Sequence, residues 1–164
     1  VGEKIFMLTE DYRRRNSEVE VKLASAFEPK VALVKFHPGF NPEILEWYVN
    51  KGYRGIILEG TGLGHVSEAC YPAIKRAVEE GLLVGMTSQC LWGRVRLTVY
   101  ETGRVLLSLG VLPLGDMLPE TALVKLMWAL AHDDAITIMK KNIAGEMTER
   151  SIYDAYVNQK NYIP

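Results

Sequence analysis

The sequence has few of the residues that mark several classes of protein. Its 164 residues include two cysteines and three histidines, too few for a disulfide scaffold, and the spacing of Cys70 and Cys90 matches no metal-ligand motif. The 19 basic and 20 acidic residues nearly cancel, so no cationic excess indicates a surface for nucleic acid or lipid. The apolar run 105–112 is too short to cross a bilayer and contains Ser and Gly. We therefore expect a cytoplasmic domain that contacts neither membrane nor nucleic acid directly.

What the sequence does contain is an alternation of strand-like and helix-like segments. Three short runs rich in Val, Ile and Leu predict buried strands at 31–36, 55–58 and 82–86. Between these runs, apolar residues at helical spacing predict helices over 42–52 and 72–81, each with a proline near its start and a glycine at its end. Strand, helix, strand, helix, strand at this spacing predicts an α/β fold with a parallel sheet.

The two ends of the chain follow other patterns. The C-terminal part is predicted to be helical over 119–130, then from an Asp cap to a Gly stop over 133–145, and again over 148–153. Near the N-terminus, residues 5–8 have the pattern of a strand, and the polar residues 12–18 are typical of a connection.

A glycine-rich segment, Glu-Gly-Thr-Gly-Leu-Gly-His at 59–65, directly follows the second predicted strand. Ligands of parallel α/β sheets bind outside the carboxyl ends of the strands, so a site is expected here. Alternating glycines permit positive φ angles and close approach of backbone N–H groups. The pattern G-x-G-x-x-G fails because His65 takes the place of the third glycine, and no P-loop lysine is present. The segment is either a ligand site without a phosphate cradle or a tight turn with no ligand.

A second polar segment follows the third predicted strand. Its hydroxyl, amide and thiol groups are suited to line a pocket for a small polar ligand. These groups belong to Thr87, Ser88, Gln89 and Cys90. A nucleophilic Cys90 would need a histidine as base and an electropositive setting, so we favour a pocket wall or a core thiol for it. The candidate bases are His37, His65 and His132.

Four segments resemble the second domain of bacterial-type L-asparaginases, the later ones as in the cytoplasmic type I enzymes. These segments are 57–66, 87–95, 100–103 and 115–126. Within this superfamily the sequence is most similar to the glutaminase-type (D-type) subunit of archaeal glutamyl-tRNA(Gln) amidotransferases. That similarity is carried by Leu63 and His65, by the connection 12–16 and by the segment 145–154.

The resemblance implies the C-terminal domain of a two-domain amidohydrolase, built as a small parallel sheet between layers of helices. Residues 1–30 would form an N-terminal strand and an interdomain connection, and residues 31–164 the domain itself. The threonine nucleophile belongs to the other domain of such enzymes, so we expect no catalytic residue in this chain and no activity from it alone. No metal or cofactor is expected in this domain.

In an amidotransferase, the whole enzyme would release ammonia from glutamine or asparagine for the conversion of Glu-tRNA(Gln) to Gln-tRNA(Gln). The resemblance implies a homodimer and a partner subunit that binds tRNA and uses ATP and magnesium.

The resemblance also implies roles for individual residues. Gly62, Gly64 and His65 would support a substrate site that the other domain completes. Other asparaginases have an asparagine in place of His65, so the substrate preference is open. The Thr87–Cys90 segment would line the effector pocket of type I enzymes. An acidic residue of other members has no matched counterpart, although Tyr100 and Glu101 are near its position.

Two alternatives stand beside this hypothesis. The chain could be the C-terminal domain of a cytoplasmic type I L-asparaginase that hydrolyses free asparagine to aspartate and ammonia, in which case it would purify only with itself. It could instead be an amino-acid-binding regulatory module, in which case the isolated chain would bind aspartate, asparagine or glutamine saturably.

Overall fold

The computed structural model of the chain describes residues 14–132 and 134–149. The strands are β1 (Val31–Lys35), β2 (Gly55–Gly60), β3 (Leu83–Ser88) and β4 (Leu112–Pro113). The helices are α1 (Glu43–Asn50), the short 3-10 helix η1 (Glu68–Cys70), α2 (Tyr71–Glu79), α3 (Glu101–Ser108), α4 (Pro119–Leu130) and α5 (Ala135–Lys140).

The four strands form one parallel sheet in the order β1-β2-β3-β4. Val31 is aligned with Gly55, and Gly55 with Leu83, so the three long strands start at the same level. Their carboxyl ends therefore lie at one edge of the sheet. The predicted parallel α/β architecture is confirmed.

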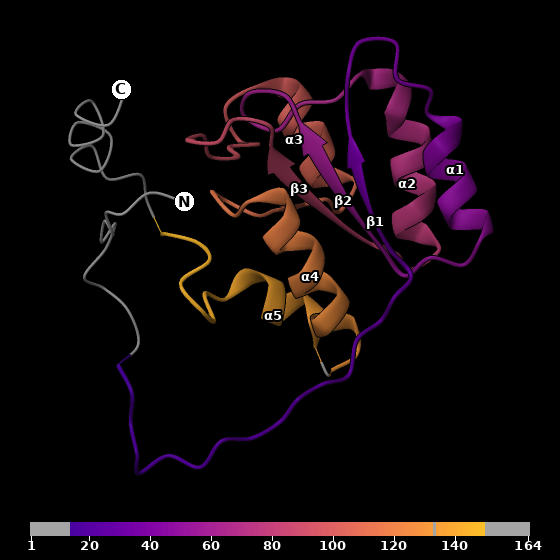
Figure 1. The fold of residues 1–164 in the computed structure, drawn as a ribbon. Coiled ribbons are helices and arrows are strands. Elements are labelled where there is room, and N and C mark those ends of the chain that lie inside the picture. Colours follow the sequence, from indigo (N-terminus) through magenta and orange to yellow (C-terminus); the bar gives the residue numbers. More distant parts are fainter. Residues whose placement is uncertain (1–13, 133, 150–164) are drawn as a thin grey trace, which may run out of the picture.

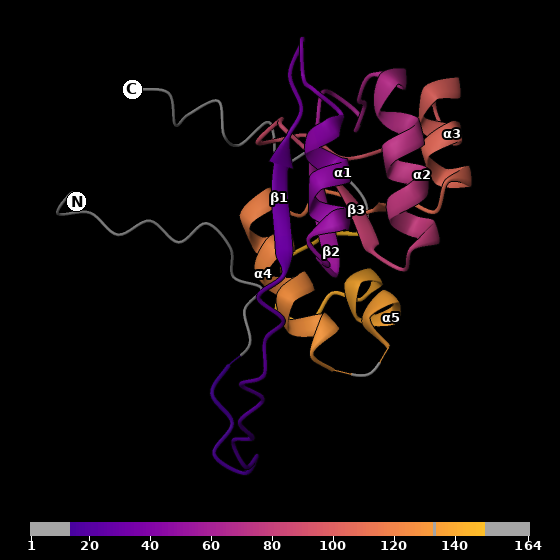
Figure 2. The same cartoon turned by 90° about the vertical axis from the view of Figure 1, so that its right-hand side faces the viewer.

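Helices cover both faces of the sheet, which makes three layers (Figures 1 and 2). Helices α1, α2 and α3 pack on one face and α4 and α5 on the other. Neighbouring residues of a strand point to opposite faces, so β2 sends Ile56 and Leu58 toward the first layer and Ile57 toward the second. Burial on both faces explains why the strands are continuous apolar runs in the sequence.

For α1, α2 and α4 the predicted starts and ends agree with the structure to within about two residues, as expected for such boundaries. Helix α1 begins at Glu43, whose N–H donates to Asn41 Oδ1 at 3.0 Å. Pro72 and Pro119 lie in the first turns of α2 and α4. Gly52, with φ of 68°, follows the end of α1 and makes the turn toward β2.

Helix α3, strand β4 and the short η1 were not predicted, and one further helix was predicted too long. The helix expected over 133–145 ends at Lys140, and its cap is Asp134, whose Oδ1 accepts from Thr137 N at 3.2 Å. The helix stops because Glu146 accepts the N–H groups of Ile143 and Ala144, so these groups bond to a side chain rather than to helical carbonyls.

The structure describes only part of the terminal segments for which the remaining predictions were made. The strand at 5–8 lies outside the described residues, as do residues 150–153 of the last expected helix, and Thr148 and Glu149 are not helical. Residues 14–30 contain no helix or strand, and their course away from the sheet is visible in Figure 1. The domain boundary at residue 30 stays a prediction. In the described part of the chain, no helix combines the length and apolar character needed to cross a membrane.

Candidate functional site

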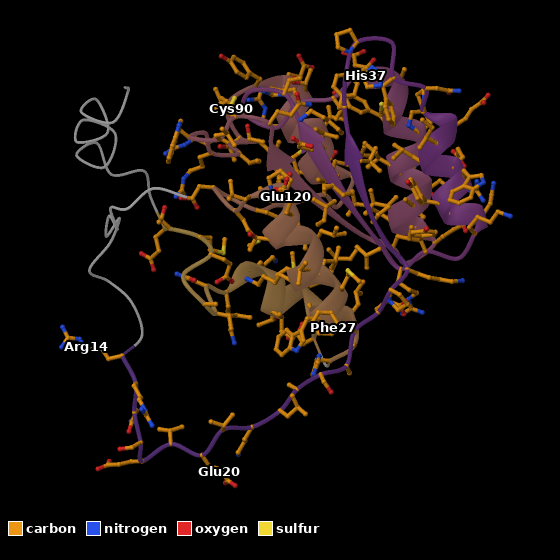
Figure 3. All side chains as sticks on the ribbon, in the orientation of Figure 1. Arg14, Glu20, Phe27, His37, Cys90 and Glu120 are labelled. Atoms are coloured by element: carbon orange, nitrogen blue, oxygen red, sulfur yellow. The ribbon has the colours of Figure 1, made fainter. Side chains whose placement is uncertain are left out.

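The segments singled out in the sequence meet at the carboxyl edge of the sheet. His37 follows β1, residues 61–65 follow β2, and residues 89–95 follow β3. Figure 3 shows His37 and Cys90 at the same end of the molecule, with Phe27 at the opposite end. Sheet topology therefore brings together segments that are far apart in the sequence, as expected for a site of this fold.

The glycine loop, residues 60–65, is a tight turn closed on itself. Thr61 N donates to His65 O and His65 N donates to Thr61 O, both at 2.9 Å. Gly62 and Gly64 have φ angles of 53° and 101°, which residues with a side chain rarely adopt. The hydroxyl of Thr61 donates to His65 O at 3.2 Å rather than to a base. Thr61 therefore lacks the setting of an activated nucleophile.

Gly64 is required by packing as well as by conformation. A Cβ atom at this position would lie 2.9 Å from both Met86 Cγ and Val95 Cγ1. The loop backbone thus rests directly on β3 and on the segment that follows it. Its position relative to the sheet edge is therefore fixed by packing.

The polar groups of the 87–90 segment hold this loop in place. Thr87 and Ser88 are the last residues of β3, not loop residues, and both are buried. Thr87 Oγ1 donates to Leu58 O at 3.2 Å, and Ser88 Oγ donates to Gly62 O at 2.6 Å. The Gln89 amide donates to the carbonyls of Phe36 and Glu59. These groups brace β1, β2 and the glycine loop, and the effector pocket remains a prediction.

Cys90 lies on the surface, so of its two interpretations the core thiol was wrong and the pocket wall stays a prediction. Its N–H donates to Ser88 Oγ at 3.0 Å. Cys70 is the buried cysteine, and burial raises the pKa of its thiol, which makes it less reactive at neutral pH.

We expect Ser88→Ala to lower the free energy of unfolding by about 1–2 kcal/mol, because two hydrogen bonds of a buried hydroxyl are lost. Urea denaturation measures the change. Ser108→Ala is the matched control, because that exposed hydroxyl bonds only to a carbonyl of its own helix. A loss no larger than that of the control would show that Ser88 does not hold the loop.

His65 points its ring toward α3. Its Nδ1 lies 3.0 Å from Thr102 Oγ1, and the Tyr100 ring centroid lies 5.5 Å from the imidazole centroid. The second nitrogen, Nε2, is buried and has no hydrogen-bond partner among the described residues. Thr102 was not among the predicted site residues, although it lies in the segment 100–103. The supporting roles of Gly62, Gly64 and His65 stay predictions.

His132 lies apart from this edge. It follows the last turn of α4, where its Nδ1 is 2.7 Å from Trp128 O. No group of three or more His, Cys, Asp or Glu side chains suited to a metal ion occurs within residues 14–132 and 134–149.

A buried ion pair on the face of the sheet that α4 and α5 cover was not predicted from the sequence. Lys125 Nζ donates to Glu146 Oε1 and to Lys141 O, and both charged side chains are 8% exposed. Burial by itself raises the pKa of Glu146, but the Lys125 ammonium and backbone N–H donors outweigh it and lower that pKa to about 2. The pair ties the loop after α5 to α4. The sequence of α4, an amphipathic helix with one lysine on its buried side, does not indicate that this lysine pairs with Glu146.

Comparison with known proteins shows the family to which the chain belongs. A model of the glutaminase/asparaginase C-terminal domain matches residues 30–142. The chain is 54% identical over 158 residues to the D-type subunit of the glutamyl-tRNA(Gln) amidotransferase of Pyrococcus horikoshii, covering 94% of this chain and 36% of the relative. For the same subunit of Methanopyrus kandleri, identity is 56% over 148 residues, with 88% and 32% covered. The chain thus spans about a third of the length of these relatives.

Solved structures give the same result. The thermostable L-asparaginase from Thermococcus kodakarensis superposes with a TM-score of 0.70 at 39% identity, covering 76% of this chain and 40% of that one. The L-asparaginase I from Vibrio cholerae gives a TM-score of 0.66 at 30% identity, covering 73% and 38%. The fold is therefore shared with part of each enzyme. This chain belongs to the glutaminase/asparaginase C-terminal domain family.

Proposed function

We propose that the chain is the C-terminal domain of the glutaminase-type subunit of an archaeal Glu-tRNA(Gln) amidotransferase. Identity above half to archaeal D-type subunits, across nearly the whole chain, is the observation that carries the proposal. The whole enzyme hydrolyses glutamine or asparagine, and the ammonia converts Glu-tRNA(Gln) to Gln-tRNA(Gln). Within that enzyme residues 1–30 provide the connection to the preceding domain and residues 31–164 the C-terminal domain.

The described residues suit a supporting role in amide hydrolysis. Such hydrolysis needs an activated nucleophile and donors that stabilise the oxyanion of the tetrahedral intermediate. The Thr61 hydroxyl is bonded to a carbonyl, and among the described residues the exposed Cys90 thiol has no hydrogen bond to a histidine. The rigid glycine loop instead presents His65 at the sheet edge, where a preceding domain that carries the nucleophile would meet it. The isolated chain is accordingly inactive.

The assembly follows from the same proposal. The enzyme is a cytoplasmic homodimer in which this domain contacts no membrane and no nucleic acid. A separate partner subunit binds tRNA and uses ATP and magnesium to activate Glu-tRNA(Gln). Together the two subunits act as a ligase, and glutamine or asparagine is the ammonia donor.

Co-purification tests the amidotransferase role. The longer protein that contains this chain is expected to purify with a large partner that binds tRNA and consumes ATP. A type I L-asparaginase, the alternative that the 39% identity to the Thermococcus kodakarensis enzyme favours, would purify only as copies of itself. That result, with hydrolysis of free asparagine and no dependence on Glu-tRNA(Gln), would replace the proposal by the alternative.

We expect His65→Ala in the longer enzyme to lower kcat/KM for amide hydrolysis about tenfold, because one hydrogen bond that contributes about 1.4 kcal/mol is lost. The free energy of unfolding should change by less than about 1 kcal/mol, since one half-buried side chain is removed. His132→Ala is the control, because His132 lies at the end of α4 and bonds to Trp128 O. An unchanged kcat/KM in His65→Ala would remove His65 from the site.

A further inference from the structure

The orientation of the His65 ring depends on one polar contact. Thr102 Oγ1, at 3.0 Å from Nδ1, is the hydrogen-bonding group that the described residues offer to the imidazole. Nε2 is covered by neighbouring atoms and is unpaired within the same residues. A buried polar atom without a partner is destabilising, so this arrangement has a cost that native structures rarely carry without a reason.

The distance between these two side chains is set by backbone packing. A Cβ at Gly103 would lie 2.3 Å from Leu97 O, so the first turn of α3 rests directly on the Leu97 backbone. A Cβ at Gly64 would lie 3.2 Å from Leu97 Cδ2, so the glycine loop rests on the same residue. Arg96 N also donates to Leu63 O at 2.9 Å. Loop and helix are thus held against a common segment, which keeps Thr102 within reach of His65.

We propose that Thr102 is a positioning residue that fixes both the orientation and the tautomer of His65. In the proposed arrangement the hydroxyl, 3.0 Å from Nδ1, donates to it and the proton of the neutral ring is on Nε2. A hydroxyl both donates and accepts, whereas each nitrogen of a neutral imidazole does only one. Neutral histidine side chains in water favour the proton on Nε2, and the Thr102 hydroxyl can donate to the unprotonated Nδ1 of that form. In a neutral imidazole, the hydrogen bond made by one ring nitrogen determines whether the other nitrogen donates or accepts.

This inference rests on the proposed function and adds a specificity to it. With the proton on Nε2, His65 is a hydrogen-bond donor. Because neighbouring atoms cover Nε2 here, they must move for a carboxylate or carbonyl oxygen of the amino-acid amide to accept its proton when the preceding domain completes the site. An asparagine side chain at this position would both donate and accept, so it would not impose this direction.

The tautomer is measurable in the 164-residue chain itself. Long-range ¹H–¹⁵N correlation at pH 8, where an ordinary histidine is neutral, distinguishes a protonated ring nitrogen from an unprotonated one. His37→Gln and His132→Gln assign the His65 signals, because the sequence has only three histidines. We expect Nε2 of His65 to carry the proton in more than about nine-tenths of molecules. A proton on Nδ1, or an averaged signal from both forms, would overturn the inference.

Variants of Thr102 separate positioning from general stability. Thr102→Ser keeps the hydroxyl and should keep the His65 signals, whereas Thr102→Val should give the averaged signals of a free imidazole. Thr98→Val, at an exposed threonine of the preceding connection, should leave them unchanged. Unaltered His65 signals in folded Thr102→Val would contradict the proposal.

Activity of the longer enzyme then distinguishes this inference from the proposed function. We expect Thr102→Val to lower kcat/KM for amide hydrolysis about tenfold and Thr102→Ser to restore it within about twofold, as expected when a positioned group is released. A fixed tautomer together with full activity of His65→Ala would leave the positioning intact and refute the role of His65 in the site.

Discussion

Gly103→Ala should lower the free energy of unfolding by about 3 kcal/mol, the upper part of the range for overpacked sites. The new Cβ would lie 2.3 Å from Leu97 O and 2.8 Å from Leu97 C, both backbone atoms that no rotamer change can move. Helix α3 would have to shift away from the 97 segment. Because α3 carries Thr102, the shift would also break the contact with His65. Urea denaturation followed by circular dichroism measures the loss.

Helix propensity alone gives the opposite expectation. Alanine is favoured over glycine inside a helix by about 1 kcal/mol, and Gly103 lies within α3. Ser108→Ala at the end of the same helix is the control for substitutions that meet no backbone, and it should change stability by less than about 0.5 kcal/mol. A Gly103→Ala variant as stable as the wild type would show that α3 does not rest on Leu97 in this way.

Lys125→Met should destabilise the domain by about 3 kcal/mol at pH 7, since removal of one partner leaves the other charge buried and unpaired. Lys125 and Glu146 are each 8% exposed, and Lys125 also bonds to Lys141 O. The loop after α5 would lose its connection to α4. Thermal and urea unfolding both report this loss.

The same pair predicts a pH dependence in the wild type. The pKa of Glu146 is lowered from its ordinary 4.5 to about 2 in the folded chain, so the unfolded state takes up the proton first as the pH falls. The stabilisation is complete above about pH 4.5 and is lost between there and pH 2, by about 3 kcal/mol. In Lys125→Met the carboxyl group loses its ammonium partner, so stability should depend less on pH in this window.

An exposed ion pair provides the comparison for this second prediction. Lys75 and Glu79 are 3.7 Å apart with side chains 61% and 65% exposed, and such pairs contribute little because solvent screens them. Lys75→Met should therefore cost less than about 0.5 kcal/mol. Equal effects of the two lysine substitutions would mean that the Lys125–Glu146 pair does not stabilise the fold.

The architecture was predictable because its signals are local. Strands β1 to β3 are buried on both faces, so each is an apolar run that any window of sequence reveals. Helix α3 was missed because Gly103 weakens its pattern, and that glycine is there for contact with Leu97. Helix α5 was predicted too long because its end depends on Glu146, which a distant lysine holds. Contacts between residues far apart in sequence leave no periodic sign.

The candidate site was predictable in place but not in detail. The glycine loop was located from its glycines and from the rule that sites follow parallel strands. The partners of its residues could not be foreseen, since Ser88 bonds to Gly62 and Thr102 to His65 across 26 and 37 positions. The sequence pattern of the 87–90 segment predicts pocket lining but does not say which carbonyls its side chains meet, and the pocket stays a prediction. The sequence therefore located the site at the carboxyl edge of the sheet, and the structure identified the hydrogen bonds that hold its residues in place.

Ammonia release tests most directly whether this chain is one domain of an amidohydrolase whose nucleophile lies in another domain. The 164-residue chain is incubated with glutamine or asparagine, alone and with a separately produced preceding domain from an archaeal D-type relative. We predict no ammonia from the chain alone and release from the mixture, with less release when the chain carries His65→Ala. Ammonia from the chain alone would contradict the account, because a nucleophile would then lie within these residues.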